Sequence, residues 1–270
     1  MVVQHNMSAM NANRQLGVTT GTLSKSTEKL SSGYRINRAA DDAAGLSISE
    51  KMRSQIRGLN KASSNAQDGI SAIQTAEGAL NEAHAILQRM NELATQAAND
   101  TNTSADRTAV QSEVDALTKE LNRIASTTQF NTKNLLDGTF SGKNLQVGAL
   151  ANQSISITIG TMNATALSVD ALCVSTFGKA GSAMTAVQHA ISKVSTQRSN
   201  LGALQNRLEH TVNNLDNVAE NTQTAESRIR DTDMASEMVQ YSATSIIQQA
   251  GQSMLAQANS QTQGVLSLIQ

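Results

Sequence analysis

The side chains that most often carry out chemistry are few and scattered in this sequence. The four histidines, His5, His84, His189 and His210, stand far apart and at no metal-ligand spacing. His84 lies in EAHAI rather than in HExxH, so the helical zinc-protease motif is missing. Neither GxGxxG nor a P-loop occurs. We therefore expect a protein that is not an enzyme and that needs no cofactor or metal.

Two further features could suggest chemistry, but each has a structural interpretation that we favour. Asp231 and Asp233, in SRIRDTDMAS, resemble a carboxylate pair, yet acidic residues also begin helices and build joints. Cys173 is the one cysteine, which excludes an internal disulfide. We interpret it as a small packing residue near the start of a helix. Met52 and Met90 are interpreted as packing residues as well.

The composition favours long helices over a globular core. The 270 residues include no proline, which costs about 3 kcal/mol inside a helix, and only 2% are aromatic. The net charge is −1 with no basic stripe, and no apolar run approaches the ~20 residues that span a bilayer, so we expect neither nucleic-acid binding nor membrane insertion. The opening MVVQHNMSAM lacks a charged region followed by an apolar one, so no cleaved secretory signal is expected.

The clearest periodic pattern lies between residues 201 and 229, where apolar residues recur every three or four positions. Such a stripe is typical of a helix that packs along another helix. The seam residues that we predict are Leu201, Leu204, Leu208, Leu215, Val218 and Ile229.

Two other stretches have the same spacing and are expected to pack beside this helix. One runs from Leu46 to Ala97 and stops at Asn99–Asn102. A shorter one follows to Ile124, with Thr103–Ser104 as its capping residues. Together these stripes predict a helical bundle over residues 45–230.

The texture changes in the middle of the chain, where residues 128–175 are richer in Asn, Gly, Thr and Ser. QSISITI, residues 153–159, alternates apolar and polar residues, and residues 145–147 could lie opposite it. This pattern predicts a β-hairpin. The expected fold is mainly α, a long antiparallel helical coiled-coil bundle formed by the N- and C-terminal segments, with a small β-hairpin patch between them.

The two ends of the chain have helical patterns that are poor in apolar residues. Ordering each residue costs ~1–2 kcal/mol of backbone entropy, whereas a buried apolar side chain returns only ~1.5–3 kcal/mol. We therefore expect residues 1–44 and 231–270 to pair with each other and to be disordered in the free monomer, with a hinge near Gly33. Their apolar residues are Leu16, Leu23, Leu30, Met254, Leu255, Val265, Leu266 and Leu268.

Several long motifs give the sequence a family resemblance. They are the opening of residues 6–12, LSSGYRINRAADDAAGLSISEKMRSQIRGL, QDGISAIQTAEGAL, ESRIRDTDMASEM, QQAGQSMLAQAN and VLSLIQ. On these motifs the chain resembles bacterial flagellins over everything outside roughly 138–182. Larger members of the family carry outer domains in that middle region, so this chain looks like a short form without an outer variable domain.

The resemblance implies a structural subunit that polymerises into the filament used for swimming. The paired ends would form an inner tube and residues 45–230 an outer tube. The protein would be secreted through the flagellar export apparatus, and its partners would be copies of itself, an export chaperone, the filament cap and the hook-junction proteins. Two alternatives remain: a hook–filament junction protein of the same family, or a secreted coiled-coil adhesin or host-receptor ligand.

The resemblance also implies a site of innate immune recognition. Flagellins that are detected by a Toll-like receptor carry Q-R-x-R-E-L-A-x-Q on the long body helix. The matching residues here are Gln88, Arg89, Leu93 and Gln96, with Glu113 on the next helix; Asn91 replaces the second arginine of the pattern. The same residues could instead contact neighbouring subunits, and we favour that interpretation.

Overall fold

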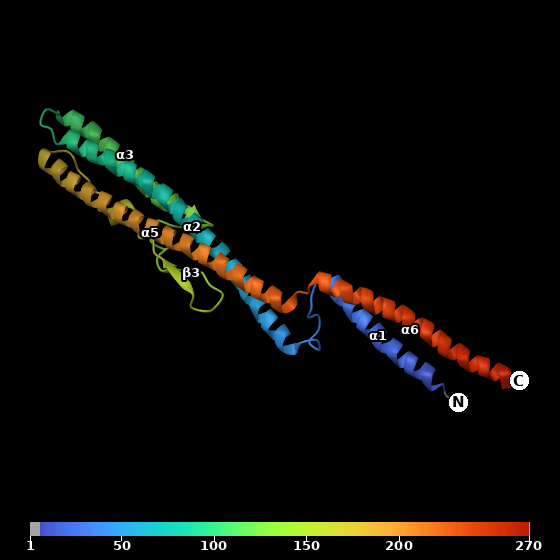
Figure 1. Ribbon diagram of the computed structural model, residues 1–270. Coiled ribbons are helices and arrows are strands. Elements are labelled where there is room, and N and C mark those ends of the chain that lie inside the picture. Colours follow the sequence, from blue (N-terminus) through green and yellow to red (C-terminus); the bar gives the residue numbers. More distant parts are fainter. Residues whose placement is uncertain (1–5, 270) are drawn as a thin grey trace. The chain divides into compact units, whose positions relative to one another are not determined.

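The computed structural model describes residues 6–269, and the side chains of residues 6–261 (Figure 1). The mainly α prediction is confirmed. The long helices are α1 (Met7–Ser32), α2 (Ala43–Ala97), α3 (Ser104–Thr127), α5 (Phe177–Arg230) and α6 (Met234–Ile269). The short elements between α3 and α5 are β1 (Gln129–Phe130), β2 (Lys133–Asn134), β3 (Lys143–Gln146), β4 (Ser154–Ile157) and α4 (Ala164–Leu167).

The contacts divide the chain into two compact units. The terminal unit comprises residues 1–54 and 221–270, and the bundle unit comprises residues 55–220. The sequence pattern placed this division after residue 44 and before residue 231. Because α2 and α5 run through the division without a break, each helix contributes residues to both units.

In the terminal unit, α1 and α6 lie side by side and antiparallel (Figure 1). Asn6 Nδ2 donates to the carbonyl of Ala258 over 2.8 Å, at the start of α1. Nearer the end of α1, Lys29 Nζ lies 3.6 Å from Oε2 of Glu237. The predicted pairing of the two ends is therefore confirmed.

A joint links the end of α1 to the turn between α5 and α6. Gly33 has φ 75°, the left-handed region that glycine tolerates, and its N–H donates to the carbonyl of Lys29. The N–H of Arg35 then donates to the carbonyl of Arg230 over 2.7 Å, and the N–H of Thr232 donates to Gly33 over 3.0 Å. Together these two hydrogen bonds fasten the two turns to each other.

Acidic side chains begin the helices that leave this joint. Asp233 Oδ1 accepts hydrogen bonds from the N–H groups of Ala235 and Ser236 at the start of α6. Asp231 forms a β-bridge with Tyr34. The interpretation of the Asp231–Asp233 pair as a joint and a helix start, rather than a catalytic site, agrees with these contacts.

In the bundle unit, α2, α3 and α5 share one continuous core with the inner faces of the β patch. Val114, Leu121, Leu201 and Leu208 are fully or almost fully buried in it. Thr103 caps α3 as predicted, and a capping box forms because Thr103 and Asp106 each accept a hydrogen bond from the other's backbone N–H.

The predicted β-hairpin is confirmed, with Leu145 opposite Ile155 in the antiparallel β3–β4 pair. The inward residues of β4 are Ile155 and Ile157, and its serines are exposed. A second hairpin, β1–β2, was not predicted. Its two turn residues, Asn131 and Thr132, both have positive φ. Such turns usually contain glycine, and this one does not.

Two residues of the α5 seam should differ sharply in their contribution to stability. Leu208 is fully buried, whereas the side chain of Val218 is 38% exposed. Leu208→Ala should lower the free energy of unfolding by about 2–5 kcal/mol, because it leaves a cavity in the core. Val218→Ala should cost less than about 1 kcal/mol. Urea unfolding followed by circular dichroism measures both, and equal losses would contradict the packing described here.

The capping box predicts a pH dependence. The side-chain and backbone hydrogen bonds from Thr103 lower the pKa of Asp106 below its ordinary value of 3.8. A carboxyl whose pKa is lower in the folded state stabilises that state above the unfolded pKa, and the effect is lost as the pH falls through the folded value. Asp106→Asn should therefore destabilise the bundle more at pH 7 than at pH values below about 3.

Thr103→Val is the matched variant for this experiment, because it removes the hydroxyl that bonds to Asp106 and keeps the carboxyl group. It should produce the same pH dependence in urea unfolding. A cost of Asp106→Asn that does not change with pH would show that the capping carboxylate contributes nothing.

Candidate assembly surface

The outward side of α6 carries the most apolar side chains of the terminal unit. Val239 and Ile246 are seven residues apart, as are Ile247 and Met254, so they share one side of the helix. All four are exposed, as are Met234 and Met238 nearer the joint. A single copy of the chain therefore leaves six apolar side chains of α6 uncovered, which we call the α6 stripe: Met234, Met238, Val239, Ile246, Ile247 and Met254.

The opposite side of α6, which faces α1, is more polar. Glu237 is only 8% exposed there, and its Oε1 atom has no hydrogen-bond partner among the described residues. Ser26 of α1 is also buried, and Gln248 Nε2 donates to Thr20 Oγ1 over 3.3 Å. Since polar contacts are directional, they fix the register of the two helices more than they stabilise the pair.

The predicted terminal residues divide between these two sides. Leu16, Leu23 and Leu30 of α1 and Leu255 of α6 are half-buried, and Leu16 Cδ1 would lie 3.4 Å from a Cβ atom added at Gly251. Met254 is exposed instead. Val265, Leu266 and Leu268 lie beyond residue 261, outside the described side chains.

The predicted seam of α5 is buried to different degrees. Leu201, Leu208 and Leu215 are buried, and Leu204 is half-buried against the same core. Ile229, in the terminal unit, is half-buried. Val218 is exposed on the side of α5 that borders a groove.

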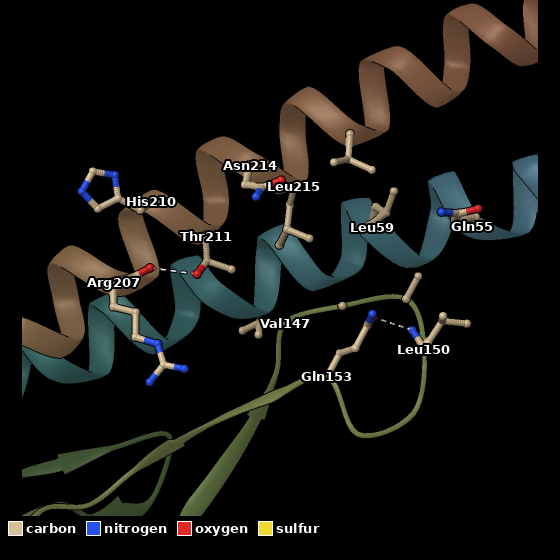
Figure 2. Close-up of a pocket in the computed structure, with 13 residues that line it drawn as sticks. Gln55, Leu59, Val147, Leu150, Gln153, Arg207, His210, Thr211, Asn214 and Leu215 are labelled. Carbon is tan, nitrogen blue, oxygen red and sulfur yellow. Dashed lines mark hydrogen bonds between the residues drawn. The ribbon is translucent and has the colours of Figure 1, made fainter.

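This groove lies between α2, α5 and the turn after β3 (Figure 2). Its volume is about 820 Å³, and Leu59, Val147 and Leu215 are among the residues that line it. Two glutamines hold the turn: Gln153 Oε1 accepts from the N–H of Leu150, and Gln146 Nε2 donates to the carbonyls of Gly148 and Leu150. His210, Arg207 and Thr211 of α5 also line the groove (Figure 2).

The predicted recognition residues form an exposed ion-pair cluster on α2 and α3. Arg89 Nη1 lies 3.1 Å from Oε2 of Glu92, and its Nη2 lies 2.9 Å from Oε1 of Glu113. Hydrogen bonds to Glu113, and then to Glu92, raise the pKa of Arg89 above its ordinary value. Gln88 and Gln96 are exposed beside them.

Leu93 does not belong to this exposed cluster, contrary to the sequence expectation. Its side chain is 1% exposed and is part of the bundle core. The bundle packs α2 against both α3 and α5, so the buried side of α2 is wider than a two-helix seam and includes residue 93.

The described residues contain no group of three or more His, Cys, Asp or Glu side chains that could hold a metal ion. Cys173 lies just before α5, where its Sγ atom is 3.2 Å from Oγ of Ser175, and that hydrogen bond lowers the pKa of the thiol. Among the helices described, none is long and apolar enough to cross a membrane.

Comparison with known proteins agrees with this description. Residues 3–141 match the bacterial flagellin N-terminal helical region, and residues 184–269 match the bacterial flagellin C-terminal helical region. A flagellin of Halalkalibacterium halodurans is 54% identical over 271 residues, covering 100% of both chains. A flagellin of Bacillus subtilis is 50% identical over 305 residues, again covering 100% of both.

A solved structure, that of Bacillus cereus flagellin, is 32% identical with a TM-score of 0.50, and the match covers 56% of this chain and 88% of the other. The two family regions together span most of the sequence. They include the helices that form the terminal unit and the bundle. The chain belongs to the bacterial flagellin family.

Proposed function

We propose that this chain is the structural subunit of an extracellular flagellar filament and that it polymerises with copies of itself. The observation that carries the proposal is the α6 stripe, an apolar surface that one copy leaves exposed. The family supports the same reading, since relatives that match along their whole length are named flagellin.

Burial of the α6 stripe against a second copy of the chain would be favourable in free energy. Each apolar side chain that becomes buried contributes ~1.5–3 kcal/mol, and the stripe offers six of them. Within one chain α6 contributes a largely polar side to the α1–α6 contact, so the half-buried leucines of α1 offset only part of the entropy of ordering two long helices. Ordering of residues 1–44 and 231–270 would then accompany polymerisation, and these ends would form the inner tube around the filament axis.

The bundle would form the outer tube, with residues 45–230 and no outer variable domain. An open helical polymer requires two different surfaces on each subunit, because each copy contacts the next one head to tail. The ion-pair cluster around Arg89 is one candidate contact in the bundle unit. The names of the relatives favour this role over a hook–filament junction protein or an adhesin.

The further partners follow from the same proposal. They are an export chaperone and the export apparatus before assembly, and the filament cap and hook-junction proteins at the ends of the polymer. For flagellins that animals detect, a Toll-like receptor would contact Gln88, Arg89, Gln96 and Glu113, which are all exposed in the single chain. Buried Leu93 would support this surface from beneath.

The proposal predicts a gain of helix on assembly. Monomers prepared by heating filaments should have less helix than reassembled filaments at the same concentration, because α1 and α6 order only when neighbours cover the α6 stripe. Circular dichroism together with electron microscopy measures both states. Equal helicity in monomer and filament would contradict the coupling.

A paired variant locates the effect in the stripe. Ile246→Gln with Ile247→Gln should raise the protein concentration that assembly requires and leave the unfolding of the bundle unchanged. Gln249→Ala is the matched control, since Gln249 is exposed on the same helix beside the stripe. If both variants assemble like the parent chain, the stripe is not a subunit contact.

Arg89 is the residue for a separate test of the bundle surface. Arg89→Ala should change the unfolding of the monomer little, because exposed ion pairs contribute little to stability. It should lower filament yield and weaken binding of the monomer to the receptor ectodomain, measured by sedimentation and surface plasmon resonance. Lys119→Ala, another exposed cation, on α3, is the control. If Arg89→Ala has the filament yield and the receptor binding of the parent chain, Arg89 takes part in neither the subunit contact nor the receptor contact.

A further inference from the structure

The methionines of this chain are divided between the two units in an unequal way. Met7, Met10, Met234, Met238 and Met254 are exposed by 49–71%, and all five lie on α1 or α6. In the bundle unit, Met90 and Met162 are buried and Met184 is half-buried. Met52, on α2, is half-buried as well.

The five exposed methionines, which we call the terminal methionines, lie at both ends of the α1–α6 pair. Since Asn6 contacts Ala258, the beginning of α1 is level with the segment around Met254. Since Lys29 contacts Glu237, the end of α1 is level with Met234 and Met238. Three of the five belong to the α6 stripe.

Methionine sulfur is open to two-electron oxidation wherever an oxidant can reach it, and the product is much more polar than the thioether. From these observations we infer that the terminal methionines are a redox modification site whose oxidation blocks assembly of the free subunit. The inference rests on the proposed function, in which neighbouring copies cover the α6 stripe. The assembled filament, in which the stripe is covered, resists the same oxidant.

The oxidant is a peroxide. The thioether sulfur attacks one oxygen of hydrogen peroxide, the O–O bond breaks, and a sulfur–oxygen bond forms. The proton of the transferred OH group passes to the departing hydroxide, so the products are the sulfoxide and one water molecule, and the two electrons that sulfur loses reduce the peroxide. Methionine sulfoxide reductases reverse the change, so the modification can act as a switch rather than as damage alone.

Oxidation disfavours assembly because each sulfoxide that becomes covered loses its hydrogen bonds with water. An unsatisfied buried polar group of this kind disfavours burial by about tenfold or more in an equilibrium constant. Several sulfoxides on the α1–α6 pair would each weaken the same contact between neighbouring copies. The bundle is unaffected, because its methionines are buried or half-buried in its core.

The test treats the full chain with hydrogen peroxide, as monomer and as filament, and maps sulfoxides by peptide mass spectrometry. In the monomer, the terminal methionines should oxidise at least about tenfold faster than Met90 and Met162, and in the filament the three that belong to the α6 stripe should be protected. The oxidised monomer should need about tenfold more protein to assemble, and methionine sulfoxide reductases should restore the original value. Bundle unfolding should not change.

Leucine variants identify the responsible sulfurs, because leucine has a similar volume and cannot be oxidised. The set M7L, M10L, M234L, M238L and M254L should assemble equally well before and after peroxide. The control set M52L and M184L should remain as sensitive as the parent chain.

Three results would overturn the inference: normal assembly of the oxidised monomer, oxidation of filaments as fast as of monomers, or continued sensitivity of the five-leucine variant. Failure of the untreated chain to assemble would instead overturn the proposed function, and this inference with it.

Discussion

The structure depends on one unusual distribution of apolar residues: α6 turns a largely polar side toward α1 and presents most of its apolar side chains outward. Glu237, buried with one oxygen that has no partner within the described part of the chain, and Lys29 lie where a conventional helix pair would place leucines or alanines. The pairing is therefore specific in register and weak in energy, and the apolar area that could stabilise it faces solvent. The bundle has the opposite arrangement, with its leucines and alanines facing inward around α2, α3 and α5.

The joint between α1 and the α5–α6 turn is held by hydrogen bonds of its own. Two turns that are far apart in sequence, around Gly33 and Asp231, are fastened by backbone hydrogen bonds. Ser49, which is fully buried, adds a hydrogen bond of 2.8 Å to Glu226, between the first part of α2 and the last part of α5. These hydrogen bonds hold the end of α1 and the start of α6 next to each other. The weak pairing of α1 and α6 can therefore extend from this point.

Much of the fold could be predicted from the sequence because helices dominate it and proline is absent. The start of α3 follows from a capping pattern, and the β3–β4 hairpin follows from alternation. Periodicity identifies the apolar side of a helix, but it does not identify what covers that side. For this reason the burial of Leu93 and the outward direction of Met254 could not be predicted. The β1–β2 turn was missed because Asn131 and Thr132 lack the usual glycine signal.

The contact between Asn6 and Ala258 joins residues that are 252 positions apart. A ribosome that adds about 5–20 residues each second needs on the order of 10–50 s to place the second partner after the first. During that interval α6 has not yet been synthesised and cannot pair with α1, even if the bundle has already folded. The α6 stripe lies on the later partner, so a chain that is truncated before Met234 would lack it altogether. The surface that one copy presents to others therefore becomes available only after α6 has been synthesised.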